Sequence, residues 1–286
     1  MTTSPVLASQ RPLVRAPRIW LETALIAALI ALLYSEIIPD LVSDWWTQPA
    51  LSYGLLIPPL ALYIAGLRRD ITLAIPAQRS WSGCWLVAFA CLVFLAGSLS
   101  AEFFLSRISL VLLLAGLVWT FWGMARLRTL AFPFLLLATM VPLPQLVYNT
   151  LSAPLQLFAS QVATDLAQSL GVTVYRDGNI IHLAQISLGV AEACSGLSSL
   201  SAMVVASLLL GFLAAASIAG RILLLVLSVP LAIAVNVLRV TGTAVLADYQ
   251  TDFALGFYHA FSGWLVFLVG LAALWVLSKI LFRVVR

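Results

Sequence analysis

The sequence predicts an all-α membrane protein with about eight transmembrane helices, an extracytoplasmic interfacial helix and a small β-hairpin. Three observations support this fold class. Hydrophobic residues make up 63% of the 286 residues and charged residues only 9%, which gives a mean hydropathy of +1.08. Apolar windows of about 19 residues, long enough to cross a hydrocarbon core of about 30 Å, recur along the whole chain. Lys and Arg gather in alternate connections between these windows, as expected for cytoplasmic loops.

The apolar windows define the predicted spans in order. They lie at residues 19–38, 51–67, 82–99, 105–123, 127–144, 194–216, 221–246 and 257–282. No segment between them is large enough to bury a separate soluble core. We therefore expect residues 1–18 to form a cytoplasmic N-terminal segment and residues 19–286 a single transmembrane domain. The first span follows arginines as a signal peptide does, but no small-residue cleavage site comes after it, so we expect it to remain uncleaved.

The charge distribution predicts the orientation. The basic connections hold Arg11, Arg15, Arg18, Arg68, Arg69, Arg79, Arg126, Arg128, Arg221, Lys279, Arg283 and Arg286. The alternate connections hold Asp40, Asp44, Glu102, Asp248 and Asp252, with Arg107 as the exception. Both termini are therefore expected in the cytoplasm, which requires an even number of spans. The net charge of +4 reflects this topology, and we expect no nucleic-acid partner.

The largest segment outside the predicted spans runs from Pro144 to Ala193, and the topology makes it extracytoplasmic. Its first part, 145–170, alternates apolar and polar residues at helical spacing, contains Pro154 and ends at Gly171, which predicts a kinked interfacial helix. Two β-prone runs follow, 172–176 and 179–183. The dipeptide Asp177-Gly178 between them suits a type I′ turn, so we expect a hairpin above the membrane.

Three polar residues fall at the same depth in the last three spans. Cys194 lies at the outer mouth of the sixth span, and His259 begins the eighth. Arg239 lies 18 residues beyond the cytoplasmic Arg221, a helical rise of about 27 Å that brings it to the outer leaflet. An arginine within an apolar span costs at least about 2.5 to 3.5 kcal/mol by insertion scales, so it is rarely retained without a partner or a function.

Together these residue types can carry out acyl transfer by a thiol. A nearby cation lowers the pKa of a cysteine, and a histidine can protonate a departing amine. An arginine can donate hydrogen bonds to the oxyanion that forms on the attacked carbonyl. Asn236, one turn before Arg239, can share its face and orient the arginine or a substrate.

Structural interpretations of the same residues stay open. A cysteine in a helix is usually a small hydrophobe, which suffices for Cys84 and Cys91 and is an alternative for Cys194. Arg239 can anchor its helix by extending to the headgroups. Glu192 can stabilise the start of the sixth helix through the helix dipole. His259 can be an interfacial residue, and His182 fits the surface of the hairpin better than a catalytic site.

Four short motifs carry a family resemblance: Tyr175-Arg-Asp-Gly-Asn-Ile-Ile-His182, Glu192-Ala-Cys-Ser-Gly196, Asn236-Val-Leu-Arg239, and Gly256-Phe-Tyr-His259 followed by Gly263-Trp264. In this order they resemble the exosortases, integral-membrane cysteine peptidases and transpeptidases of Gram-negative bacteria that are related to archaeosortases. The Glu-Ala-Cys-Ser-Gly element is the most specific of the four. The resemblance runs from Pro142-Leu-Pro144 to Trp264, so the motif-bearing core is 142–264.

The resemblance implies a role for each motif residue. Cys194 is expected to be the nucleophile, Arg239 to assist the oxyanion or the substrate, and His259 to act as general acid and base. The supporting or substrate-binding residues are then Glu192, Ser195, Gly196 and Asn236. Family members often carry acidic residues just after the histidine, whereas Ala260 and Ser262 stand here. The group that orients His259 is therefore open, with Asp248 and Asp252 as candidates.

The resemblance also implies the partners and the location. The substrate is expected to be a secreted protein with a C-terminal sorting signal: a short Pro-Glu-Pro-like motif, an apolar helix and a basic tail. A surface glycan or lipid is a candidate acceptor, and membrane lipid surrounds the spans. The expected location is the bacterial inner membrane, with the active site facing the periplasm. No cofactor or metal is implied, because two histidines and three cysteines form no ligand cluster at metal-binding spacing.

Three other classes remain as alternatives. A transporter or flippase could bind an anionic lipid at Arg239, although no inverted repeat or continuous polar path is evident. A polyprenyl-phosphate transferase could use Arg239 on phosphate, but it would not need a thiol. A non-catalytic factor for exopolysaccharide assembly would tolerate Cys194→Ala.

Overall fold

The computed structural model of the chain describes residues 16–184, 186–190, 197–214, 217–250 and 259–284. The helices are α1 (Ala16–Leu33), α2 (Ile37–Thr47), the 3₁₀ helix η1 (Pro49–Leu56), α3 (Ile57–Leu67), α4 (Arg69–Ala74), α5 (Ser82–Ser100), α6 (Phe103–Trp122), α7 (Met124–Thr129), α8 (Ala131–Ala138), α9 (Gln145–Ser169), α10 (Leu197–Leu213), α11 (Ile218–Tyr249) and α13 (His259–Val284). The strands are β1 (Val174–Asp177), β2 (Ile180–Leu183) and β3 (Ser187–Gly189).

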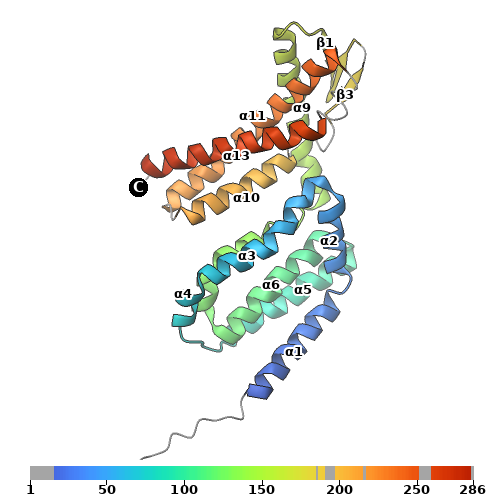
Figure 1. Ribbon diagram of the computed structural model, residues 1–286. Coiled ribbons are helices and arrows are strands. Elements are labelled where there is room, and N and C mark those ends of the chain that lie inside the picture. The colour runs from blue at the N-terminus through green and yellow to red at the C-terminus, as the bar shows by residue number, and fades with distance from the viewer. Residues whose placement is uncertain (1–15, 185, 191–196, 215–216, 251–258, 285–286) are drawn as a thin grey trace, which may run out of the picture.

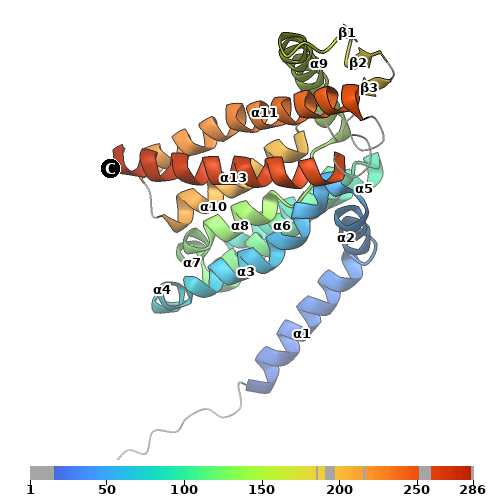
Figure 2. The same cartoon turned by 45° about the horizontal axis from the view of Figure 1, so that its top comes forward.

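The helices form two groups (Figure 1). The first group runs from α1 to α8, and the second contains α10, α11 and α13, which lie side by side in Figures 1 and 2. α9 and the small sheet gather at one end of the second group. This mostly helical architecture with a small sheet confirms the predicted fold class in its main features.

The predicted number of spans is only partly supported. Among the described residues, five helical stretches are long and apolar enough to cross a membrane: Pro49–Leu67, Ser82–Ser100, Phe103–Trp122, Ile218–Tyr249 and Phe261–Arg283. A sixth results if Trp20–Leu33 and Ile37–Thr47, which meet at a bend of 63°, count as one span. Shorter helices occupy the predicted spans at 127–144 and 194–216, namely α7 with α8, and α10. The count of eight therefore stays a prediction.

The division between α7 and α8 depends on a nearby proline and on a distant arginine. Pro133 lacks the backbone N–H that would bond to the carbonyl of Thr129 in a continuous helix. In the structure Arg68 Nη1 donates to that carbonyl oxygen at 3.2 Å. α7 ends at Thr129 and α8 begins two residues later, so the apolar run 127–144 does not form one straight helix.

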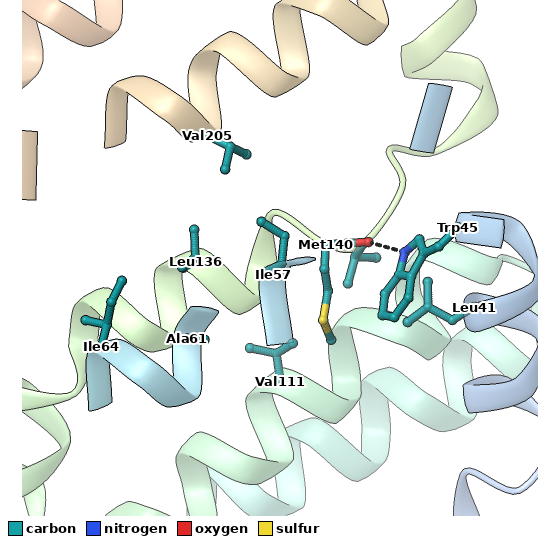
Figure 3. Close-up of a cluster of buried hydrophobic side chains, with 10 residues drawn as sticks. Leu41, Trp45, Ile57, Ala61, Ile64, Val111, Leu136, Met140 and Val205 are labelled. Carbon is teal, nitrogen blue, oxygen red and sulfur yellow. Dashed lines mark hydrogen bonds between the residues drawn. The ribbon is translucent and has the colours of Figure 1, made fainter. Parts of the chain in front are cut away.

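A buried apolar cluster connects the two helix groups. Figure 3 shows its side chains, which come from α2, α3, α6, α8, the segment just after α8, and α10: Leu41, Trp45, Ile57, Ala61, Ile64, Val111, Leu136, Met140, Val141 and Val205. The indole N–H of Trp45 donates to the carbonyl oxygen of Met140 at 3.0 Å, so this large side chain is buried with its polar atom satisfied. Phe132 of α8 and Phe212 of α10 also stack, with ring centroids 3.9 Å apart.

The basic connections gather at one end of the molecule. Arg126 donates from Nε and Nη2 to the carbonyl oxygen of Ile75, at 2.9 and 2.8 Å. Arg68 lies over the ring of Phe212, near the end of α10, at 4.7 Å. Connections that the charge pattern assigned to one side of the membrane are thus in contact. Which side faces the cytoplasm stays a prediction.

Arg107, the exception to the charge pattern, is buried at the opposite end. Its Nη2 lies 2.6 Å from Oδ2 of Asp44, and Oδ1 of Asp44 accepts a hydrogen bond from Gln48 at 2.8 Å. A charge removed from water in this way is tolerated because its counterion lies beside it. Arg107 is therefore an internal ion-pair partner and not a free basic loop residue.

α11 is longer than a bilayer core. Its 32 residues correspond to about 48 Å, whereas the core is about 30 Å thick. The last turns of α11 pack with α9 and the sheet through a cluster of small and β-branched residues: Ala163, Ala167, Val172, Val174, Ile181, Val190, Val240 and Ala244. This end of α11 therefore holds α9 and the sheet, which form the part of the chain between α8 and α10.

α9 confirms the helix predicted at 145–170, which contains Pro154 and is followed by Gly171 with φ +86°. Its packing differs from that of a simple amphipathic helix. The buried side is made of small residues such as Ala163 and Ala167, while Leu146 and Phe158 are 79% and 53% exposed. Small residues allow close approach to α11, and the large apolar side chains point outward, as contact with lipid would require.

The predicted hairpin is present and has a third strand. β1, β2 and β3 form an antiparallel sheet in that order. The prediction of a type I′ turn centred on Asp177-Gly178 was wrong. Asp177 pairs with Ile180, so the two loop residues are Gly178 and Asn179. Only Gly178 of the two has a positive φ, at +59°, which is the pattern of a type II′ turn with glycine first. On the sheet, the rings of His182 and Tyr175 stack 5.5 Å apart, and His182 Nδ1 lies 2.7 Å from Ser187 Oγ.

Candidate active site

The predicted site residues differ in how far the structure describes them. Glu192, Cys194, Ser195 and Gly196 lie outside the described residues, which resume at Leu197 with α10. His259 is the first residue of α13; its side chain is outside the described part. Asn236 and Arg239, both on α11, are described in full.

The second helix group brings three predicted segments toward one end. Met203 of α10 and Val235 of α11 both pack against Gly270 of α13, where an added Cβ would lie 3.1 Å from Val235 Cγ2 and would overlap Met203 Cε. These three residues therefore mark one level of the bundle. α10 and α13 run in one direction and α11 in the other (Figure 1).

Counting from that level gives the height of each segment. Leu197 precedes Met203 by six residues and His259 precedes Gly270 by eleven, rises of about 9 and 16 Å. Arg239 follows Val235 by four residues, a rise of about 6 Å in the same direction because α11 is antiparallel to the other two. The beginnings of α10 and α13 and the Arg239 turn of α11 are thus at the same end of the bundle.

Asn236 and Arg239 lie between two apolar clusters of α11. Ala232, on one side, packs with Met203, Leu224 and Leu274, and Val240, on the other, packs with α9 and the sheet. Asn236 is only 3% exposed, while Arg239 is half-buried. Because they are three residues apart, their side chains share one face of the helix.

The guanidinium of Arg239 lies against α13. The point where a Cβ of Gly263 would be is 3.1 Å from Nη2, 3.2 Å from Cζ and 3.6 Å from Nε of Arg239. Gly263 follows His259 by four residues in the same helix, so the two positions lie on one face, one turn apart. The structure thus brings the Arg239 side chain to the face of α13 on which His259 stands.

The first group also contacts the start of α10. The Tyr53 hydroxyl, from η1, forms a hydrogen bond with the side chain of Ser201, and Ser201 is in the second turn of α10. A cavity of about 840 Å³ lies nearby and is bordered by residues from α2, η1, the α5–α6 turn, α6 and the start of α9, among them Arg107, Glu102 and Tyr148. This cavity gives the end of the molecule that bears the predicted site a solvent-accessible hollow beside α9.

Sequence reasoning did not give Gly263 a role of its own, and it did not identify Tyr53. The signal for Gly263 was its distance of four residues from His259, which places both on one helical face. Tyr53 gave no sequence signal, because its partner Ser201 is far away in the chain. Among the described residues, no group of three or more His, Cys, Asp and Glu side chains is arranged to hold a metal ion.

A comparison with protein families supports the resemblance. A family model described as transmembrane exosortase matches residues 45–276, which contains the whole motif-bearing core and most of the helices before it. No curated protein and no solved structure matches the sequence. Because the matched region covers more than half of the chain, the chain belongs to the transmembrane exosortase family of membrane-embedded sorting enzymes.

Proposed function

We propose that this exosortase is a cysteine peptidase or transpeptidase that cleaves the C-terminal sorting signal of secreted proteins at the outer face of the bacterial inner membrane. Cys194 is the nucleophile, His259 the general acid and base, and Arg239 the oxyanion or substrate ligand. Glu192, Ser195, Gly196 and Asn236 support these groups. Both termini lie in the cytoplasm, and the reacting groups face the periplasm.

The observation that carries this proposal is the position of Arg239. Its guanidinium lies against Gly263, one turn beyond His259 in α13, and the segment that contains Cys194 leads directly into α10 at the same end of the bundle. A guanidinium on α11, an imidazole at the start of α13 and a thiol three residues before α10 would form the set of groups that acyl transfer needs.

In the proposed reaction the Cys194 thiolate attacks the carbonyl carbon of the scissile peptide bond. The C=O electron pair moves to oxygen, and Arg239 donates hydrogen bonds to the resulting oxyanion. When the intermediate collapses, the C–N bond breaks and His259 gives its proton to the leaving amine. The thioester is then attacked by water or by an acceptor nucleophile, whose proton passes to His259, and the thiolate is released.

The membrane geometry suits a substrate with a C-terminal apolar helix. Arg239 stands about 27 Å of helical rise above Arg221, close to the thickness of the hydrocarbon core. A substrate helix of similar length, packed beside these helices with its basic tail in the cytoplasm, would present its sorting motif near the level of Arg239. A surface glycan or lipid is the proposed acceptor if the thioester is transferred and not hydrolysed.

The test is co-expression with a tailed secreted protein from the same genome, followed by measurement of substrate size and release from the membrane. We expect wild type to shorten the substrate and Cys194→Ala to leave it intact. Cys84→Ala and Cys91→Ala are matched controls, because both cysteines are exposed thiols on α5, and they should process normally.

The other outcomes separate the alternatives. Equal processing by wild type and Cys194→Ala would contradict thiol catalysis and favour a transporter or an assembly factor. Activity on a lipid phosphate that resists iodoacetamide would instead favour a polyprenyl-phosphate transferase.

A further inference from the structure

We propose that Gly263 is a positioning residue for Arg239: its missing side chain sets how closely the guanidinium can lie against α13, and thereby where it stands relative to the reacting groups. This inference rests on the proposed function for its effect on catalysis. The contact itself does not depend on that function, and it can be measured separately.

The geometry at Gly263 leaves no room for a side chain without movement of Arg239. The three heavy atoms nearest to an added Cβ all belong to the Arg239 side chain, at 3.1, 3.2 and 3.6 Å. Optimal separations between non-bonded carbon atoms are about 3.5 to 4.0 Å. An alanine would therefore displace the guanidinium by a few tenths of an ångström, and a larger side chain would displace it further.

The environment of Gly263 differs from that of the other close-packed glycine in α13. Gly270 lies against Met203 and Val235, so it serves apolar packing between three helices, as small residues often do in membrane proteins. Gly263 instead lies against the end of one long, flexible side chain. That chain can move without unpacking the helices, so a substitution at Gly263 should preserve the fold.

Helix propensity favours the same conclusion. Glycine within a helix is less favourable than alanine by about 1 kcal/mol, so alanine at position 263 would strengthen α13 if no contact opposed it. A loss of function in Gly263→Ala with unchanged thermal stability would then point to the displaced guanidinium and not to a weakened helix.

The expected effect is on the chemical step. A misplacement of about 1 Å can lower a rate about 100-fold, so a shift of a few tenths of an ångström should lower kcat about 3- to 10-fold in Gly263→Ala. Gly263→Val should lower it further. KM should change little if Arg239 acts on the oxyanion, because that interaction is made in the transition state.

The experiment measures cleavage of a tailed substrate by the purified full-length protein in lipid nanodiscs, for Gly263→Ala in the Arg239 and Arg239→Lys backgrounds. A lysine has no planar guanidinium to be displaced. Gly263→Ala should therefore lower the cleavage rate markedly when residue 239 is arginine and hardly at all when it is lysine. Gly66→Ala is the matched control, since nothing lies within 4 Å of a Cβ added at Gly66. Gly270→Ala, by contrast, should lower the thermal midpoint.

A second readout is independent of activity. Phenylglyoxal modifies exposed guanidinium groups, and the rate at Arg239 can be followed by mass spectrometry of its peptide. We expect this rate to rise in Gly263→Ala and to stay at the wild-type value in Gly66→Ala.

Two results would overturn the proposal. One is an equal slowing by Gly263→Ala in both backgrounds, which would mean that the glycine acts through packing alone. The other is unchanged cleavage and unchanged modification in Gly263→Ala. If wild type cleaves no tailed substrate, the proposed function fails, and the modification rate still decides whether Gly263 holds Arg239.

Discussion

Two arginines within helices illustrate how a charged residue can be accommodated in this fold. Arg107 is 7% exposed and forms an ion pair with Asp44 at 2.6 Å, so its position is explained by a partner from another helix. Arg239 lies against α13 at a glycine, at the end of the bundle where α10 and α13 begin. The first arginine connects α6 to α2, and the second is the better candidate for chemistry.

The Arg107–Asp44 pair gives a stability prediction. Removing one partner of a buried pair leaves an uncompensated charge and costs about 3 to 5 kcal/mol. Because the Asp44 side chain is 27% exposed, we expect Asp44→Ala to lower the free energy of unfolding by an amount near the lower end of this range, about 3 kcal/mol. The midpoint of thermal unfolding in detergent should fall accordingly. Asp70→Ala, on the short helix α4, is the control, and an equal drop there would show that the ion pair is unimportant.

At the scale of single elements, local patterns predicted most of the structure. The apolar windows predicted α3, α5, α6, α11 and α13. The positions of proline and glycine residues predicted α9 and the first two strands. These features depend on residues close in the chain. The division of α7 from α8 was missed although Pro133 was visible, because the Thr129 carbonyl finds its donor in Arg68, far away in the sequence.

The candidate site was predictable to a similar extent. Helical spacing placed Asn236 and Arg239 on one face of a helix, one turn apart, and both are found on α11 at the junction of two clusters. The contact of Arg239 with Gly263 required knowledge of how α11 and α13 pack, which no periodicity in one segment reveals. The roles of Cys194 and His259 remain predictions from residue chemistry and family resemblance.

The hydrogen bond between η1 and α10 gives a prediction at this scale. Tyr53→Phe removes the bond to Ser201, which should lower the free energy of unfolding by about 1 kcal/mol. It should also slow substrate processing, because the first turns of α10 follow the Cys194 segment and would be held less firmly. Tyr63→Phe, at a position 62% exposed, should do neither. Wild-type behaviour of Tyr53→Phe in both assays would show that this contact does not support the site.

At the scale of the whole molecule, the contacts give the two ends different charge environments. Arg68 and Arg126 bind backbone carbonyls at one end, and the Asp44 pair and the Glu102-lined cavity lie at the other. If the basic end is the cytoplasmic one, as the charge pattern predicts, the cavity and the Asp44 pair lie on the outer side.

Labelling with a membrane-impermeant maleimide tests this orientation. In a variant with Cys91 and Cys194 replaced by alanine, Cys84 lies at the start of α5 beside the basic end, and we expect it to be unlabelled in intact cells. A cysteine introduced as Asp165→Cys, at an exposed position of α9, should be labelled. Permeabilised cells should label both. The reverse pattern in intact cells would invert the proposed topology.

The length of α11 also has a consequence for how this sequence can vary. The helix runs without a break from Ile218 to Tyr249 and contains Pro230, so the height of Arg239 above the basic end depends on the number of residues between them and on where that proline stands. Exchanging one apolar residue for another in this stretch, Pro230 excepted, leaves that height unchanged. Inserting or deleting a single residue would shift Arg239 by about 1.5 Å and rotate it by about 100° around the helix axis. Residue number in this stretch should therefore be far less free to change than residue type.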